Sequence, residues 1–102
     1  MEVQEGKVRG ALESALSYIK RGWCQNAGHT KDGKVCLLES LALGAVKHTS
    51  SISDFYRLEN VLFRIVDNLL GHPKQGVSGW NDDTKRQKRD VIELLEKAIK
   101  NS

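Results

Sequence analysis

The chain has 102 residues, of which 39% are hydrophobic and 28% charged, and its formal net charge is +3. This length predicts one domain, residues 1–102, and the balance of residue types excludes a disordered or fibrous protein. No apolar run approaches the roughly 20 residues that span a bilayer, so we expect no membrane partner. The small net charge does not by itself indicate nucleic acid as a partner.

The start of the chain, residues 1–5, reads Met-Glu-Val-Gln-Glu and lacks the apolar segment of a signal peptide. We therefore expect a cytoplasmic protein. Its two cysteines, Cys24 and Cys36, are then expected to be reduced thiols rather than a disulfide.

Apolar residues at helical spacing predict the first two helices. A stripe on one face of residues 5–21 predicts a helix that ends at Gly22. A denser apolar run predicts a second helix over residues 35–48. The first stripe consists of Val8, Ala11, Leu12, Ala15, Leu16 and Ile19.

The third and fourth helices are predicted over residues 53–70 and 83–100. Ser51, with Asp54 three residues later, is typical of an N-terminal cap. Gly71 and Pro73 are expected to stop the third helix. The fourth helix follows Asn81-Asp82-Asp83, any of which suits its cap.

These elements predict an all-α fold, a compact antiparallel four-helix bundle in which the only other element is a short hairpin turn at residues 31–34. The two long, polar connections are residues 22–34 and 71–80. In an up-down-up-down bundle the first and third connections lie at the same end. Because loops on a rigid scaffold often carry function, we expect the functional site at that end.

Each long connection contains one of the two tryptophans, followed at once by small polar residues. A tryptophan there either stacks on a planar ligand or closes the core, and an Asn-Asp pair either binds a ligand or caps a helix. The candidate ligand- or partner-binding residues are Trp23, Gln25, His29, Lys74, Trp80, Asn81, Lys85 and Arg86.

Four basic residues are expected in the first two turns of the last helix: Lys85, Arg86, Lys88 and Arg89. Cations there oppose the helix dipole, so they form either a solvated face or a site for a phosphate or an acidic protein. Nucleic-acid binding through this cluster is a second interpretation. The neighbouring Asp82, Asp83 and Asp90 argue against it.

Catalysis is the weaker interpretation. Cys24 and His29, with Asp82 orienting the imidazole, would form a thiolate pair, but no nucleophile motif surrounds Cys24. The cysteine and histidine spacings differ from those of zinc sites. We therefore predict no catalytic residue, no metal and no cofactor, and keep a cysteine-dependent enzyme at Cys24 as a third alternative.

Short motifs give the chain a family resemblance. Trp23-Cys24-Gln25, the helix that begins near Cys36, Trp80-Asn81-Asp82 and the ending Leu94-Leu95-Glu96-Lys97-Ala98 lie within residues 10–100. In this pattern the chain resembles an uncharacterised domain-of-unknown-function family of small proteins from bacteria and their phages. It departs from the family's Gly-Ala pair in the middle helix, where it has Glu39-Ser40. The resemblance implies a compact helical domain of phage or mobile-element origin, with no settled activity.

The leading hypothesis is a small non-enzymatic binding protein. Its loop end would engage a host protein or a small anionic, nucleotide-like ligand. The apolar second helix also leaves a homodimer open.

Overall fold

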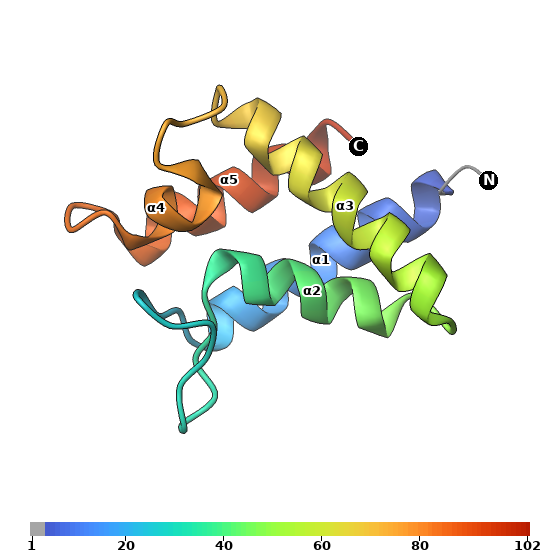
Figure 1. Ribbon diagram of the computed structural model, residues 1–102, viewed down its shortest axis with the longest axis horizontal. Helices are drawn as coiled ribbons and strands as arrows, with labels where there is room; N and C mark the ends of the chain where they lie inside the picture. The colour runs from blue at the N-terminus through green and yellow to red at the C-terminus, as the bar shows by residue number, and fades with distance from the viewer. Residues whose placement is uncertain (1–3) are drawn as a thin grey trace.

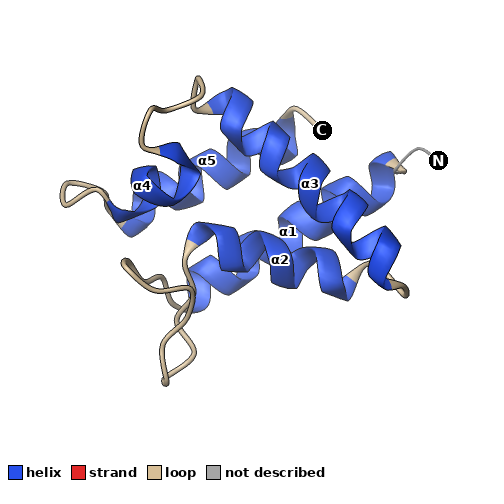
Figure 2. Ribbon diagram, viewed as in Figure 1, coloured by secondary structure: helices blue, strands red, loops and turns tan. Residues whose placement is uncertain are grey.

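The computed structural model describes residues 4–102, so the first three residues of the acidic start lie outside it. The described residues form helices and no strand, which confirms the all-α prediction (Figure 2). The prediction of four helices was wrong, because a short fifth helix lies in the third connection. The helices are α1 (Glu5–Arg21), α2 (Leu37–Lys47), α3 (Ile52–Leu69), α4 (Gly76–Asp82) and α5 (Lys88–Lys100).

The four long helices alternate in direction along the chain, as expected for an antiparallel bundle (Figure 1). Helix α1 packs against α2 and α5, and α3 lies across α2. The first long connection and α4 lie at one end of the molecule, and the short α2–α3 link lies at the other. Within residues 4–102, no helix combines the length and apolar character needed to cross a membrane.

Helix α1 has the predicted bounds, and its apolar stripe faces the core. Val8, Ala11, Leu12, Ala15 and Ile19 are all buried.

Helices α1 and α2 approach closely because both present small residues at the contact. A Cβ added at Gly44 would collide with the backbone carbonyl of Ala11, and one added at Gly10 would meet the imidazole of His48. The close approach of α2 to α1 is therefore made at Gly44, about one turn after Glu39-Ser40.

Helix α2 is shorter than predicted, because Cys36 caps it from outside. The Cys36 sulfur accepts a hydrogen bond from the backbone N–H of Glu39 at 3.3 Å. The predicted cap of α3 is confirmed, since the Ser51 hydroxyl accepts from the Asp54 N–H at 3.1 Å. After α3, Gly71 has a φ of 72°, a conformation that favours glycine, and the helix ends there as expected.

The prediction for the last helix was wrong at its start. Asn81 and Asp82 end α4 instead of capping α5, and α5 begins only at Lys88. Its first turn is closed by Asp90, whose carboxylate accepts from the Gln87 N–H at 2.8 Å. Lys85 and Arg86 therefore lie before the helix, not in its first two turns.

Candidate functional site

Asn81, on α4, joins three separate parts of the chain. Its side chain is 1% exposed, and its Oδ1 accepts from the Trp23 indole N–H at 2.7 Å and from the Leu37 N–H at 3.0 Å. Its Nδ2 donates to the Cys24 carbonyl at 3.2 Å. One amide thus ties α4 to the first connection and to the first residue of α2.

The neighbours of Asn81 extend this network. The Gln25 side-chain amide donates to the Asn81 carbonyl at 3.0 Å and to the Asp83 carbonyl at 2.7 Å. The Asp82 carboxylate accepts from the Asn26 N–H at 2.8 Å and from the Asn81 amide at 2.9 Å. We call the set Trp23, Gln25, Asn81 and Asp82 the Asn81 latch.

Trp80 is held by Arg86. The guanidinium carbon lies 3.8 Å from the centroid of the indole, and Arg86 Nε donates to the Trp80 carbonyl at 2.8 Å. This cation–π contact uses the flat face that a planar ligand would need. The half-buried ring also packs against the core.

The first connection is shaped by its own backbone bonds. The Val35 N–H donates to the Gly22 carbonyl, and the Cys24 N–H donates to the Val35 carbonyl, both at 3.0 Å. The predicted turn at residues 31–34 is confirmed, with a φ of 87° at Gly33 and the Thr30 N–H bonded to the Lys34 carbonyl. The first connection is therefore a folded unit that the latch fastens to α4.

Cys24 lies at the base of this connection. It is buried, and its thiol donates to the Ala27 carbonyl at 3.5 Å. Burial raises the pKa of the Cys24 thiol, and the nearby Cys36 and Asp82 raise it further. A nucleophilic cysteine needs the opposite shift, so these features favour a structural thiol. Both cysteines are free, as expected.

The structure brings together five of the eight predicted site residues: Trp23, Gln25, Trp80, Asn81 and Arg86. The other three lie apart. His29 is exposed and pairs with Glu39, Nδ1 to Oε2, at 3.0 Å. Lys74 and Lys85 are exposed on separate connections.

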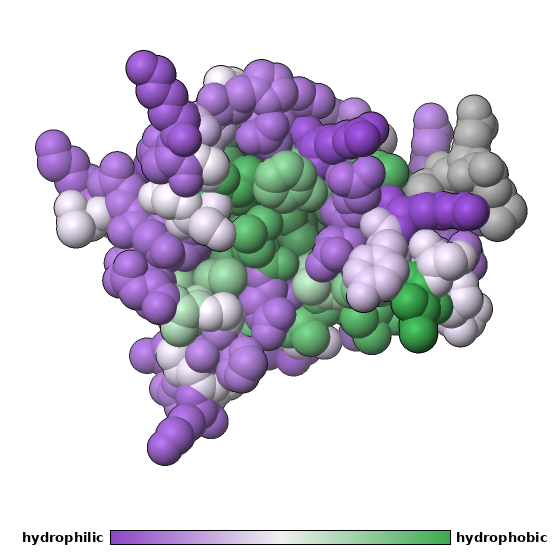
Figure 3. Space-filling view, in the orientation of Figure 1, coloured by the Kyte–Doolittle hydropathy of each residue, from purple (hydrophilic) through white to green (hydrophobic). Residues whose placement is uncertain are grey.

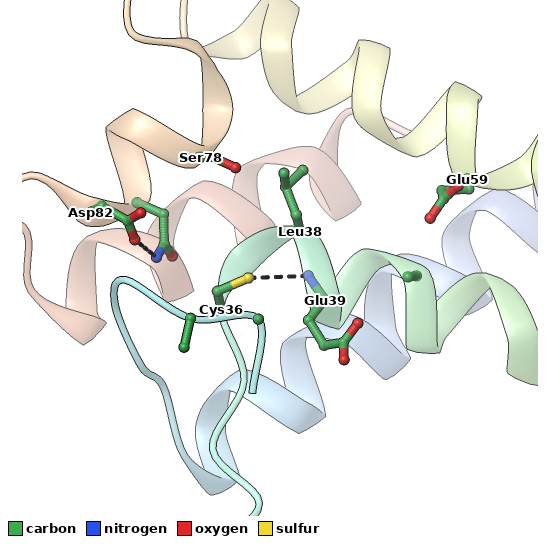
Figure 4. Close-up of a pocket in the computed structure, with 10 residues that line it drawn as sticks. Cys36, Leu38, Glu39, Glu59, Ser78 and Asp82 are labelled. Carbon is green, nitrogen blue, oxygen red and sulfur yellow. Dashed lines mark hydrogen bonds between the residues drawn. The ribbon is translucent and has the colours of Figure 1, made fainter. Parts of the chain in front are cut away.

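A cleft of about 330 Å³ opens beside the latch, where α2, α3 and α4 meet (Figure 4). Cys36 and Glu39 border it from the start of α2, Ser78 and Asp82 from α4, and Glu59 from α3. Leu38 supplies apolar surface. Of the predicted site residues, Asn81 alone lines the cleft.

The cleft is acidic although the chain carries a net positive charge. The charged side chains among its lining residues are Glu39, Glu59 and Asp82. His29 neutralises Glu39 in part when its imidazole is protonated. Within residues 4–102, no buried side-chain nitrogen or oxygen lacks a hydrogen-bond partner. The latch is thus satisfied without a ligand. Of the three carboxylates of the cleft, Asp82 is bonded within the latch and Glu39 pairs with His29, whereas no bond of the Glu59 carboxylate is found within residues 4–102.

Sequence reasoning missed the cleft residues on α2 and α3. Glu59 lies between the aromatic residues Tyr56 and Phe63, all three outside the core stripe of α3. Two aromatics seven residues apart off the buried face were the signal that could have indicated a functional surface.

The fold and the latch define a small, all-helical domain whose first connection is fastened to α4 by a tryptophan–asparagine network. The chain belongs to the family of unknown function DUF6197, whose model matches residues 4–101. This finding confirms the expectation of an uncharacterised family. Comparison with curated proteins and with solved structures found no match.

Proposed function

We propose that this domain is a non-catalytic protein-binding module whose binding site is the cleft between α2, α3 and α4. One observation carries the proposal. The Trp23 indole N–H and the side-chain amides of Gln25 and Asn81 are bonded within the protein, whereas the adjoining cleft presents apolar surface and the Glu59 carboxylate to a ligand. In this proposal the residues around Trp23 and Asn81 hold the walls of the cleft in place, and the partner contacts the residues that line the cleft.

The charge of the cleft selects among the ligands expected from the sequence. A phosphate or nucleotide would meet Glu39, Glu59 and Asp82 and would be repelled. A protein partner that offers a cationic group is attracted by the same carboxylates. A phage or mobile-element origin, which the family resemblance implies, would make that partner a host protein.

The basic residues near α5 support this choice over nucleic-acid binding. Arg86 is stacked on Trp80, and Lys88 donates through Nζ to the Lys20 carbonyl at 2.7 Å. Two of the four cations expected to form one cluster are thus bonded within the protein. Lys85 and Arg89 remain as exposed cations.

A photo-crosslinker placed in the cleft tests the proposal. Ser78 lines the cleft and is exposed, so Ser78→p-benzoyl-phenylalanine, expressed in the cells that encode the protein, should yield a discrete protein adduct on irradiation. Lys7→p-benzoyl-phenylalanine is the matched control, because Lys7 is exposed near the start of α1, at the opposite end. Absence of an adduct from position 78, or the same adducts from both positions, would overturn the proposal.

A further inference from the structure

The cleft continues into an apolar groove between α2 and α3. The groove has a volume of about 400 Å³ and is lined by Leu38, Leu41, Tyr56, Glu59, Asn60 and Phe63. Leu38 and Glu59 line both the groove and the cleft, so the two form one continuous surface. Figure 3 shows apolar side chains gathered over the region where α2, α3 and α4 meet.

Helix α3 presents large apolar side chains to solvent along this groove. Tyr56 is 61% exposed and Phe63 is 38% exposed, and they lie seven residues apart on one helical face. Ile52, one turn before Tyr56, is 76% exposed and extends the same stripe. Contiguous exposed aromatic and aliphatic side chains are typical of a protein-docking surface.

The charged residues that line this surface are all acidic. Glu59 stands where groove and cleft meet, and Glu39 and Asp82 stand farther into the cleft; no lysine or arginine lines either part. An apolar strip that ends in carboxylates complements a segment with an apolar face and a cationic end.

We propose that the α2–α3 groove binds an amphipathic helical segment of a partner protein, with its apolar face on Tyr56 and Phe63 and its basic residues directed at Glu59 and the cleft. This inference rests on the proposed function and adds the chemistry of the partner. The same carboxylates disfavour nucleic acid and an anionic membrane, because both would bring further negative charge to Glu59.

A pair of peptides that differ only in the sign of their charge tests the proposal. The probe is a synthetic helix of about 16 residues, which is about 24 Å long. It carries one Leu stripe and terminal lysines, and its counterpart has glutamate at each lysine position. The titration is followed by the amide NMR shifts of the full-length protein. The basic peptide should shift resonances of α2 and α3 along the groove and should bind at least about fivefold more tightly than the acidic one.

Surface variants locate the binding. Phe63→Ala should weaken the basic peptide about tenfold, and Glu59→Lys should weaken it about fivefold or more while improving binding of the acidic peptide. Glu96→Lys, the same charge change at an exposed position on α5, should alter affinity less than twofold. The native pattern of amide shifts establishes that each variant is folded.

The outcomes separate this inference from the proposed function. Equal binding of both peptides, or of neither while position 78 still crosslinks a protein, overturns the basic amphipathic partner and leaves the binding module standing. No peptide binding and no adduct overturns both. Groove resonances that move with protein concentration alone assign the surface to a second copy of this chain, which also overturns the proposed partner.

Discussion

The Asn81 latch and the α2–α3 groove lie side by side, yet they use their residues in opposite ways. The latch contains residue types that usually indicate binding, and its polar atoms are bonded internally, with Asn81 1% exposed. The groove contains residue types that usually form a core, and Tyr56 and Phe63 face solvent. In this domain the conspicuous polar motif is bonded within the fold, and the exposed apolar surface is the part that the proposed partner would contact.

Removing the side chain at the centre of the latch should have the largest effect on stability. Asn81→Ala leaves the Trp23 indole N–H, the Leu37 N–H and the Cys24 carbonyl without their partner. Because each buried unsatisfied group costs about 1–3 kcal/mol, we expect a loss of about 3 kcal/mol or more in the free energy of unfolding, measured by urea denaturation. Asn68→Ala, an exposed amide on α3, should change it by less than about 0.5 kcal/mol. A mild effect at Asn81 would contradict the structural role of the latch.

The packed face of α2 should be nearly as sensitive. Gly44→Ala places a methyl group against the Ala11 carbonyl, so α1 and α2 must separate. Overpacking of this kind costs about 1–3 kcal/mol. Gly6→Ala on α1 is the matched control, because a Cβ there meets nothing within 4 Å, and alanine should stabilise the helix by up to about 1 kcal/mol. If both changes acted in the same direction, the close α1–α2 approach would be refuted.

A single bond of the latch can be isolated with Trp23→Phe. The change keeps an aromatic ring and removes the donor to Asn81, so we expect a loss of about 1–2 kcal/mol in thermal or urea denaturation. Trp80→Phe controls for the smaller ring, since no acceptor for the Trp80 indole N–H was found among the described residues and its main partner is the Arg86 guanidinium. Equal losses at both positions would mean that ring size, not the hydrogen bond, sets the cost.

These effects also explain which features could be predicted from the sequence. The bounds of α1 and the Ser51 cap follow from local periodicity and capping chemistry, and both were confirmed. The convergence of the two connections followed from the alternating direction of the helices, because the first and third connections of such a bundle lie at the same end. The helix bounds and the cap depend on residues close together in the chain.

Helix α4 could not be predicted locally, because its seven residues include Gly76 and Gly79, which disfavour a helix. It is held by tertiary contacts, above all the burial of Val77 and Asn81. Asn81 and Asp82 have the chemistry of caps, but Trp23 and Asn26, more than 50 residues away, bind them instead. The groove likewise required knowledge that α2 lies beside the outer face of α3.

The smallest effect on stability is expected from Cys24. It lies beside the Asn81 latch, but its side chain makes none of the hydrogen bonds of the latch. Its folded-state pKa is raised, chiefly by burial, so the neutral thiol is the form that the fold favours. The stability that this group contributes is complete below the pKa of about 8.5 of an ordinary thiol and is lost as the pH rises through the higher folded value. Between pH 8 and pH 10 the free energy of unfolding of the wild type should therefore fall more steeply than that of Cys24→Ala, measured by urea denaturation under argon.

The Cys24 thiol should also react with a disulfide reagent at pH 8 more slowly in the folded protein than after unfolding, because burial limits both access and thiolate formation. Parallel pH profiles for the two proteins would contradict the raised pKa of Cys24. Rapid modification of folded Cys24 would assign it a reactive thiolate and reopen the cysteine-dependent enzyme as an interpretation of this end of the molecule.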